Sequence, residues 1–145
     1  MTGALVDTGF LVSLFRRSDR LRPAARDYLQ AHTHALATVA PVIVETCFFL
    51  DPRGKSELLE WIMRGGLAVA EVPVDAYADL RTSILKYADR DIDFTDAALV
   101  WFAAVSGCRR ILTVDERDFG VYRLKGNKRF DVLPWMSTAL TKQPR

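Results

Sequence analysis

Cysteine and histidine are scarce in this chain of 145 residues, with two of each. Cys47 and Cys108 form no CxxC pair and lack the spacing of a metal knuckle, so neither a disulfide framework nor a cysteine-based zinc site is indicated. We expect both thiols to be buried or half-buried in a reducing compartment. His32 and His34 have an HxH spacing, but no third nitrogen or sulfur ligand accompanies them, and an ordinary surface turn is the better interpretation.

The chain also lacks an excess of one charge and any long apolar run. It has 20 basic and 18 acidic residues, a formal net charge of +2, and 50% hydrophobic residues. This composition is typical of a globular protein and argues only weakly for an anionic partner. The first residues, MTGALVDTGFLVSLFRR, have no leading basic region, and Asp7 interrupts their apolar part. We therefore expect no signal peptide, no membrane-spanning helix and a cytoplasmic location.

Short apolar runs alternate with longer segments of helical period, the pattern of βαβ units around a parallel sheet. We expect one α/β domain over residues 1–145, in which a mainly parallel central sheet is flanked by helices. Its core should span about 3–134, with a C-terminal tail at 135–145. Strands are predicted at 4–7, 35–39, 67–72, 110–114 and 131–133. Helices are predicted at 8–15, 21–32, 41–50, 55–64, 74–88 and 96–106, with a turn at 51–54.

Two acidic residues follow predicted strands directly. Asp7 closes the apolar segment ALVD, and Asp115 closes ILTVD. Ligands of open α/β sheets bind outside the carboxyl ends of the strands, so both side chains should project at the functional edge of the sheet. Two acids at one edge suggest a site but do not define one.

A third acid, Glu45, lies within the apolar run VIVETCFFL at 42–50. The helix predicted there has little polar face, so we expect this carboxylate to be buried. A buried, unpaired carboxylate costs several kcal/mol unless a cation, a metal ion or a proton accompanies it. Metal or substrate chemistry is one interpretation, and an Arg or Lys partner from elsewhere in the fold is the other.

The fourth acid, Asp96, stands at the start of a helix in DIDFTDAALVWFAAVSG. Asp93 and Asp96 have the i, i+3 spacing of a capping-box-like helix start, and acids there also complement the helix dipole. Taken alone, Asp96 can therefore be purely structural. Beside the other three acids it has a second interpretation, because a helix start holds a carboxylate rigidly at the edge of a sheet.

Four carboxylates that converge on one site repel one another and have raised, coupled pKa values unless a divalent cation neutralises them. Ligation by oxygen alone favours a hard ion such as Mg²⁺ or Mn²⁺ over zinc. Such ions retain water molecules, one of which can act as a nucleophile. The sequence thus predicts a carboxylate–metal site.

Four segments in order, ALVDTGFLVSLF, PVIVETCFFL, KYADRDIDFTDAALV and ILTVDERDFGVYR, resemble the PIN-domain nucleases, in particular the VapC-type toxin ribonucleases of toxin–antitoxin modules. The resemblance covers nearly the whole chain. The family's four acids match, in order, Asp7, Glu45, Asp96 and Asp115. Register alternatives for these acids are Asp93 and Asp118, and the hydroxyls expected close by are Thr8 and Thr113.

The resemblance implies a PIN-like fold and an Mg²⁺- or Mn²⁺-dependent endoribonuclease of a type II toxin–antitoxin system. It would hydrolyse RNA phosphodiesters with metal-activated water, using one or two ions. Asp7 and Asp96 would hold the metal, with Glu45 and Asp115 bound directly or through water. It further implies a homodimer that a cognate antitoxin inhibits.

Basic residues gather in two parts of the sequence. The first group, which the RNA interpretation makes candidate backbone contacts, includes Arg16, Arg17, Arg20 and Arg22. The second group is Arg109, Arg110, Arg123, Lys125, Lys128 and Arg129. A solvated surface explains either group equally well, whereas phosphate contacts would make binding strongly dependent on salt.

Two other functions fit parts of the sequence. A receiver-like or phosphatase-like domain would use Asp7 as the phosphoryl acceptor, but such a site needs further acids near the first strand, and DTG is followed by apolar residues. A non-catalytic PIN module that only binds nucleic acid or protein would be expected to lack at least one of the four acids, and all four are present.

Overall fold

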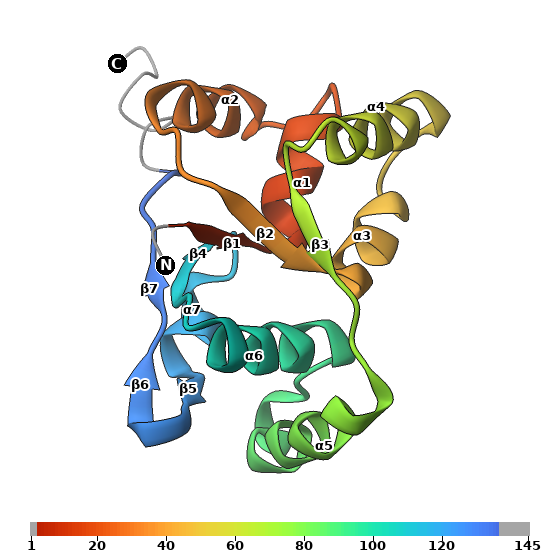
Figure 1. The fold of residues 1–145 in the computed structure, drawn as a ribbon. Helices are drawn as coiled ribbons and strands as arrows, with labels where there is room; N and C mark the ends of the chain where they lie inside the picture. The colour runs from red at the N-terminus through yellow and green to blue at the C-terminus, as the bar shows by residue number, and fades with distance from the viewer. Residues whose placement is uncertain (1–2, 137–145) are drawn as a thin grey trace.

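The short apolar runs of the sequence form the strands of one parallel sheet. The structure, a computed structural model, describes residues 3–136. The strand order is β3-β2-β1-β4-β7, and all four pairings are parallel (Figure 1). The strands are β1 (Ala4–Val6), β2 (Leu36–Val39), β3 (Ala68–Ala70), β4 (Arg110–Leu112) and β7 (Asp131–Val132). The predicted α/β fold with a central parallel sheet is confirmed.

The central strands are apolar throughout because helices cover both faces of the sheet. Every residue of β1 and β2 is buried. Leu5 pairs with Ala37 on one side and with Ile111 on the other, which places β1 at the centre. The ladder continues beyond β1, since the Asp7 amide donates to the Leu112 carbonyl at 2.9 Å. The backbone at the start of the candidate site is therefore fixed by the sheet.

Helices lie on both sides of the sheet (Figure 1). On one side, α1 contacts α2, α3 and α4, and on the other, α6 contacts both α5 and β2. Three short 3-10 segments, η1 (Val74–Ala76), η2 (Ala88–Arg90) and η3 (Lys125–Asn127), complete the helical structure. The α-helices are α1 (Thr8–Phe15), α2 (Arg22–Ala31), α3 (Ala40–Cys47), α4 (Pro52–Met63), α5 (Tyr77–Lys86), α6 (Phe94–Ser106) and α7 (Glu116–Val121).

Several predicted boundaries are wrong. The segment predicted as a turn at 51–54 begins α4, because the Asp51 carboxylate caps it by accepting from the Gly54 amide at 2.7 Å and Pro52 suits the first helical turn. The helix predicted at 74–88 is divided into η1 and α5, and the helix predicted at 41–50 ends as α3 at Cys47. The sequence interpretation also missed α7 and a small hairpin of β5 (Arg123–Leu124) and β6 (Lys128–Arg129).

Trp135 belongs to the core, so the prediction that the tail begins at residue 135 is wrong. Its side chain is fully buried, and its ring meets that of Phe10 edge to face with centroids 4.8 Å apart. The indole Nε1–H donates to the Thr113 carbonyl at 2.9 Å, which satisfies the buried polar atom of the ring. The rest of the predicted tail, from 137 onward, lies outside the described residues.

The cysteines and histidines occupy the surroundings that the sequence indicated. Cys108 is buried, Cys47 is half-buried, and both are free thiols. His32 is exposed, and His34 Nε2 shares a 2.8 Å hydrogen bond with the Tyr28 hydroxyl. Within residues 3–136, no helix is both long enough and apolar enough to cross a membrane.

Candidate active site

The candidate site is a cleft of about 540 Å³ at the carboxyl ends of the central strands. From β1, the chain adds β2 and then β3 toward one edge of the sheet. It then crosses to β4, which pairs with β1 on the opposite edge. The strand order therefore reverses between β1 and β4. Such a switch point is where open α/β sheets bind ligands. All four predicted acids and both register alternatives line the cleft: Asp7, Glu45, Asp93, Asp96, Asp115 and Asp118.

Three helices begin at this cleft, and an aspartate caps each of them. Asp7 accepts from the Thr8 amide at the start of α1 at 2.8 Å. Asp93 accepts from the Asp96 amide at the start of α6 at 2.8 Å, and Asp115 accepts from the Asp118 amide at the start of α7 at 3.1 Å. Caps and helix dipoles both favour a carboxylate at a helix start. The local sequence thus fixes three of the carboxylates in place, and the capping role considered for Asp93 is real.

Asp7 is the most deeply placed of the acids, with 7% of its surface exposed. Its Oδ1 accepts from the Thr8 amide and its Oδ2 accepts from the Thr113 hydroxyl, both at 2.8 Å. The Thr113 Oγ1 in turn accepts from the Asp115 amide at 2.9 Å and so links the acids that follow β1 and β4. Burial raises the pKa of Asp7 to about 6, against the lowering effect of these two hydrogen bonds, and the charge of Glu45 contributes to the rise.

Asp96 is half-buried in the first turn of α6. Burial, followed by the charges of Asp7 and Asp93, raises its pKa to about 8. The Tyr122 hydroxyl donates to Asp96 Oδ2 at 2.8 Å and partly offsets that rise. Burial and this neighbouring carboxylate also raise the pKa of Tyr122, so its hydroxyl remains a donor over the ordinary pH range. Tyr122 was missed in the sequence interpretation.

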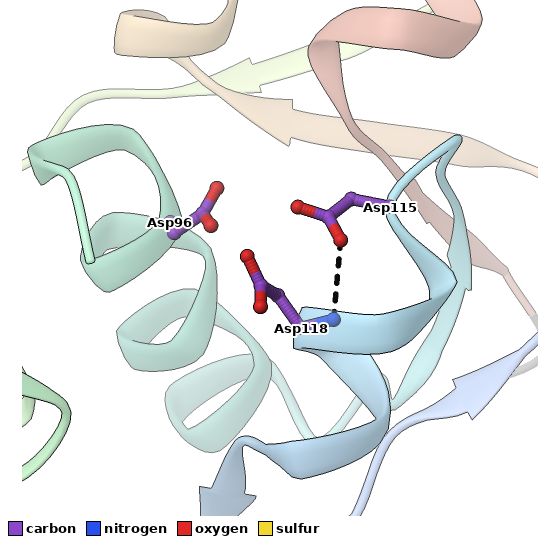
Figure 2. Close-up of side chains that lie close together, drawn as sticks. All are labelled: Asp96, Asp115 and Asp118. Atoms are coloured by element: carbon purple, nitrogen blue, oxygen red, sulfur yellow. Dashed lines mark hydrogen bonds between the residues drawn. The ribbon is translucent and has the colours of Figure 1, made fainter. Parts of the chain in front are cut away.

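The tightest group of acids is Asp96, Asp115 and Asp118, each of which offers one carboxylate oxygen within 4.8 Å of the others. Figure 2 shows the Asp96 side chain on α6 facing those of Asp115 and Asp118 across a common space. Asp118 Oδ1 also accepts from Arg90 Nη1 at 2.7 Å, in an ion pair that leaves about 30% of each side chain exposed. Burial is the main cause that raises the pKa of Asp115. The structure thus brings both candidates for the last acid into the site.

These donors suit a hard divalent cation. The three closest ligand groups offer carboxylate oxygen only, which matches the preference of Mg²⁺ and Mn²⁺. The Thr8 hydroxyl also lines the cleft, and its Oγ1 is buried without a hydrogen-bond partner among residues 3–136. Buried polar atoms rarely stay unpaired. Thr8 and Thr113 lie beside the acids, as predicted: Thr113 bonds to Asp7, and Thr8 lines the cleft with a hydroxyl oxygen that has no hydrogen-bond partner among the described residues.

The prediction that Glu45 is buried is wrong. Its side chain is half-buried at the cleft, and three apolar neighbours, Val44, Phe48 and Phe49, are 61%, 80% and 53% exposed. Part of the apolar surface of α3 and of the residues directly after it therefore faces outward, and Glu45 keeps contact with water. Within the described part of the chain Glu45 has no Lys or Arg ion-pair partner, so the alternative of an internal cation is not supported.

Few basic side chains balance the acids of the cleft. Of the four arginines predicted to contact RNA, Arg16 lines the cleft, Arg17 and Arg20 are exposed, and Arg22 is half-buried. Among the described residues that line the cleft, Arg16 and Arg90 are the basic ones, and Arg90 was not singled out from the sequence. Phosphate contacts by the four predicted arginines stay a prediction.

The fold and the acid cluster define an α/β domain with a carboxylate site suited to divalent cations. A sequence profile of the PIN domain matches residues 4–125, and the chain therefore belongs to the PIN domain family. It is 26% identical over 134 residues to Ribonuclease VapC26 of Mycobacterium tuberculosis (strain ATCC 25618 / H37Rv), a match that covers 90% of this chain and 99% of that protein. The predicted family is confirmed.

Two solved structures share the fold. VapC20 from Mycobacterium tuberculosis, a sarcin-ricin loop cleaving toxin, superimposes with a TM-score of 0.69 at 18% identity and covers 75% of this chain and 87% of its own. A chain of a toxin–antitoxin complex from Klebsiella pneumoniae superimposes with a TM-score of 0.60 at 16% identity and covers 91% of this chain and 97% of its own. At these identities the likeness concerns the fold.

Proposed function

We propose that this protein is a metal-dependent endoribonuclease, the toxin of a type II toxin–antitoxin system. The observation that carries the proposal is the meeting of Asp96, Asp115 and Asp118 at the switch point of a PIN fold, with Asp7 and Glu45 in the same cleft. Crowded carboxylates with raised pKa values are typical of cation sites, because a bound cation offsets the repulsion between their negative charges. The name of the relative VapC26 supports RNA as the substrate.

In this proposal, Asp7 and Asp96 hold Mg²⁺ or Mn²⁺, as one or two ions, with Glu45 and Asp115 bound directly or through water. The structure supports adding Asp118 to this set. A bound ion would stabilise negative charge on the phosphate and lower the pKa of a coordinated water. The chain's own groups position the ligands: the Tyr122 hydroxyl orients Asp96, and the Thr113 hydroxyl connects Asp7 to the backbone of Asp115.

The receiver-like alternative is less favoured because the PIN domain profile matches residues 4–125 of the chain. The DTG that contains Asp7 is followed by apolar residues, and these do not supply the further acids that a phosphoryl-acceptor site needs close to the first strand. A non-catalytic binding module is disfavoured because the acids are all present and gathered in one cleft. The carboxylate–metal nuclease uses both of these observations.

A cognate antitoxin and a second copy of the chain are the protein partners that we propose, in the cytoplasm where the RNA substrate is found. The toxin–antitoxin complex among the similar structures supports an antitoxin. A groove of about 420 Å³ between α3, α5 and α6 is lined by the exposed side chains of Val44, Phe48 and Tyr77. This apolar surface supports a protein contact, because it is costly to leave in water. Light scattering over a range of concentrations tests the homodimer, and a short neighbouring reading frame for a DNA-binding protein would identify the antitoxin.

The decisive experiment is cleavage of a structured RNA pool by the purified chain in Mg²⁺ or Mn²⁺ and in a chelator. Asp96→Asn and Asp7→Asn should abolish cleavage, and Asp75→Asn, which changes an exposed acid on η1, should not. Cutting that needs the metal and both acids supports the proposal. Cutting that persists in the chelator or in both variants contradicts it and would indicate a contaminating nuclease.

A further inference from the structure

The β5–β6 hairpin is the most basic segment of the described chain. Four of the seven residues in RLKGNKR, 123–129, are Arg or Lys, and none is acidic. Gly126 and Asn127 have φ values of 77° and 60°, the left-handed backbone that lets the chain reverse within a short turn. Every residue from Lys125 to Arg129 is exposed. The hairpin therefore presents its positive charges to solvent.

The pairing of the hairpin places like charges together. Arg123 stands directly opposite Arg129, and Leu124 stands opposite Lys128. Like charges at opposed positions destabilise a two-stranded ladder. Arg109 adds a third guanidinium, since its Nη1 donates to the Arg129 carbonyl at 3.3 Å. An anion bound at the hairpin would offset the repulsion between these positive charges, and such binding would explain why they are placed together.

Arg123 has a structural task that fixes the hairpin to the candidate active site. Its Nη1 donates to the carbonyls of Gly120, Val121 and Tyr122 at 2.8, 2.8 and 3.1 Å, at the carboxyl end of α7. Its amide donates to the Tyr87 hydroxyl at 2.8 Å. A guanidinium there also complements the dipole of α7. These hydrogen bonds therefore join the hairpin to the end of the helix that carries Asp118.

The other three basic side chains, those of Lys125, Lys128 and Arg129, are available to a ligand. Within residues 3–136, none of them forms an ion pair with a carboxylate. Of these three, Lys125 lines a groove of about 350 Å³ between the hairpin, α5 and α6, and Lys128 and Arg129 lie on the strand that follows the turn. Lys86, the half-buried Trp101 and the polar side chains of Thr82 and Ser83 line the groove, and Asp79 is the one acid among its described lining residues. Cations beside hydroxyls and an aromatic ring are the surface that single-stranded nucleic acids use.

We propose that the β5–β6 hairpin and this groove bind the phosphate backbone of the RNA at a distance from the bond that is cut. The inference rests on the proposed function, because RNA is the polyanion that the enzyme would bring to this surface. The cleft itself is rich in carboxylates and has only Arg16 and Arg90 as basic lining residues in the described chain, so it repels phosphates. Affinity for RNA must then come from basic surface outside the cleft, and the hairpin supplies it.

Chain length limits how far this contact lies from the acids. Lys125 follows Asp118 by seven residues, which span at most about 25 Å when extended. A nucleic-acid strand in a duplex carries one phosphate per roughly 3.4 Å of axis, so this reach corresponds to about seven phosphates at most, and an extended single strand covers it with fewer. An RNA that extends about seven nucleotides or more from the cleaved bond can therefore contact both places. A much shorter RNA can occupy the cleft alone.

The test compares two triple variants that remove the same charge. The hairpin variant is Lys125→Gln, Lys128→Gln, Arg129→Gln, and the matched control, here called the α4 variant, is Arg53→Gln, Lys55→Gln, Arg64→Gln at exposed positions of α4 and of its C-cap. Binding of a fluorescent, unstructured 30-nucleotide RNA is measured in chelator by anisotropy, over a range of salt concentrations. Loss of three phosphate contacts should weaken binding roughly 50-fold at 0.15 M salt and reduce the slope of log K against log salt by about 2. The α4 variant should change binding less than threefold.

A third variant separates charge from folding. Lys125→Arg, Lys128→Arg, Arg129→Lys keeps every charge and should bind like the unchanged protein, so a fold defect in the hairpin variant cannot imitate the effect. With Mg²⁺, the hairpin variant should raise KM for the 30-nucleotide RNA while cleavage of a three-nucleotide RNA, which is too short to contact the hairpin from the cleft, stays unchanged. Both results support the inference.

The failure of this inference and the failure of the proposed function give different results. If the chain cuts RNA but the hairpin and α4 variants bind the 30-nucleotide RNA alike, the hairpin inference is overturned and the nuclease stands. If the hairpin variant loses binding although no RNA is cut in any metal, the phosphate-binding surface stands and the nuclease does not. If the unchanged protein binds no RNA at low salt but cuts RNA with Mg²⁺, the hairpin inference is overturned and the nuclease stands; if it neither binds nor cuts RNA, both are overturned.

Discussion

Replacing Asp7 by asparagine should stabilise the metal-free protein at alkaline pH while it abolishes RNA cleavage. The reason is that Asp7 is a buried carboxylate, and burial disfavours its ionised form. Asp7 is 7% exposed, and burial together with the charge of Glu45 raises its pKa to about 6. Asparagine has nearly the same shape, and its amide oxygen can still accept from the Thr8 amide. The variant therefore removes the charge and keeps most of the packing.

The size of the effect follows from the pKa. A shift from 3.8 to about 6 corresponds to about 3 kcal/mol, at roughly 1.4 kcal/mol for each pKa unit. In the unchanged protein, the Thr113 hydroxyl donates to Asp7 Oδ2. Asparagine would present an NH₂ group at this position instead, and the loss of the hydrogen bond costs about 1 kcal/mol. The net gain is about 2 kcal/mol at pH 8. For a domain of this size that corresponds to a rise of about 4–8 °C in Tm.

The pH dependence has a definite sign. Because the folded pKa of Asp7 is raised, the folded protein holds a proton between about pH 4 and pH 6 that the unfolded chain has released. The free energy of unfolding therefore falls as the pH rises through this window, and the full penalty is present at pH 8. Below about pH 4 both states are protonated and the penalty is absent. Asp7→Asn should then gain stability at pH 8 and gain none at pH 4.

Thermal unfolding followed by circular dichroism in a chelator measures both values. Asp75→Asn is the control, because this aspartate is exposed and its replacement should leave Tm unchanged at either pH. Urea unfolding at pH 8 supplies the free energy independently of the heat-capacity correction. A variant destabilised by the same amount at pH 4 and pH 8 would refute the reasoning, because the loss would then come from packing or hydrogen bonding and not from the buried charge.

Three further results are expected. In the same unfolding assay, Mg²⁺ at 10 mM should raise the Tm of the unchanged protein at pH 8 and raise it much less at pH 4, because only ionised acids bind the cation. An equal rise in Tm at both pH values would mean that the ion binds elsewhere. Tyr122→Phe should lower kcat about tenfold or more with little change in KM, since it removes the hydrogen bond to Asp96, and unchanged kcat would limit the tyrosine to packing. Asp118→Asn should leave stability within about 1 kcal/mol, because its ion pair with Arg90 is partly exposed, yet weaken Mg²⁺ binding in calorimetry; unaltered binding would exclude Asp118 from the metal site.

The parts of the site that the sequence predicts are those fixed by local rules. A short apolar run reads as a buried strand, and the carboxyl ends of parallel strands meet at one edge, so Asp7 and Asp115 could be placed before the structure was known. Asp96 could be placed because a capping pattern marks the start of its helix. Each of these inferences uses residues within one turn or one strand of the acid itself.

The missed residues reach the site through contacts that are distant in sequence. Tyr122 bonds to Asp96 across 26 positions, and Arg90 bonds to Asp118 across 28. No local period or cap indicates such pairs. Helix α7 was missed because it has six residues, too few to show a helical period, and the side chain of Asp115 is what starts it. The capping residue Asp115 could have indicated the start of this helix from the sequence.

The error over Glu45 has a different cause. Hydrophobic residues around a helix indicate how much apolar surface it has, but they do not say what covers that surface. Val44 in α3 and Phe48 directly after it remain exposed, and the carboxylate lies at the boundary between the cleft and the neighbouring groove. The sequence pattern around Glu45 therefore indicates the amount of apolar surface but not which part of it the fold leaves exposed.

The distribution of charge connects the metal, the substrate and the hairpin. The net charge of the chain is only +2, yet the cleft has many acids and two basic residues among its described lining. The rest of the surface must then carry a larger positive surplus than the net charge indicates. A polyanion is attracted to that surplus and repelled by the cleft, so a divalent ion is needed to let a phosphate approach Asp96 and Asp115. In the proposed function, the basic surface would hold the RNA and the acids would hold the metal, so both roles follow from the same separation of charge.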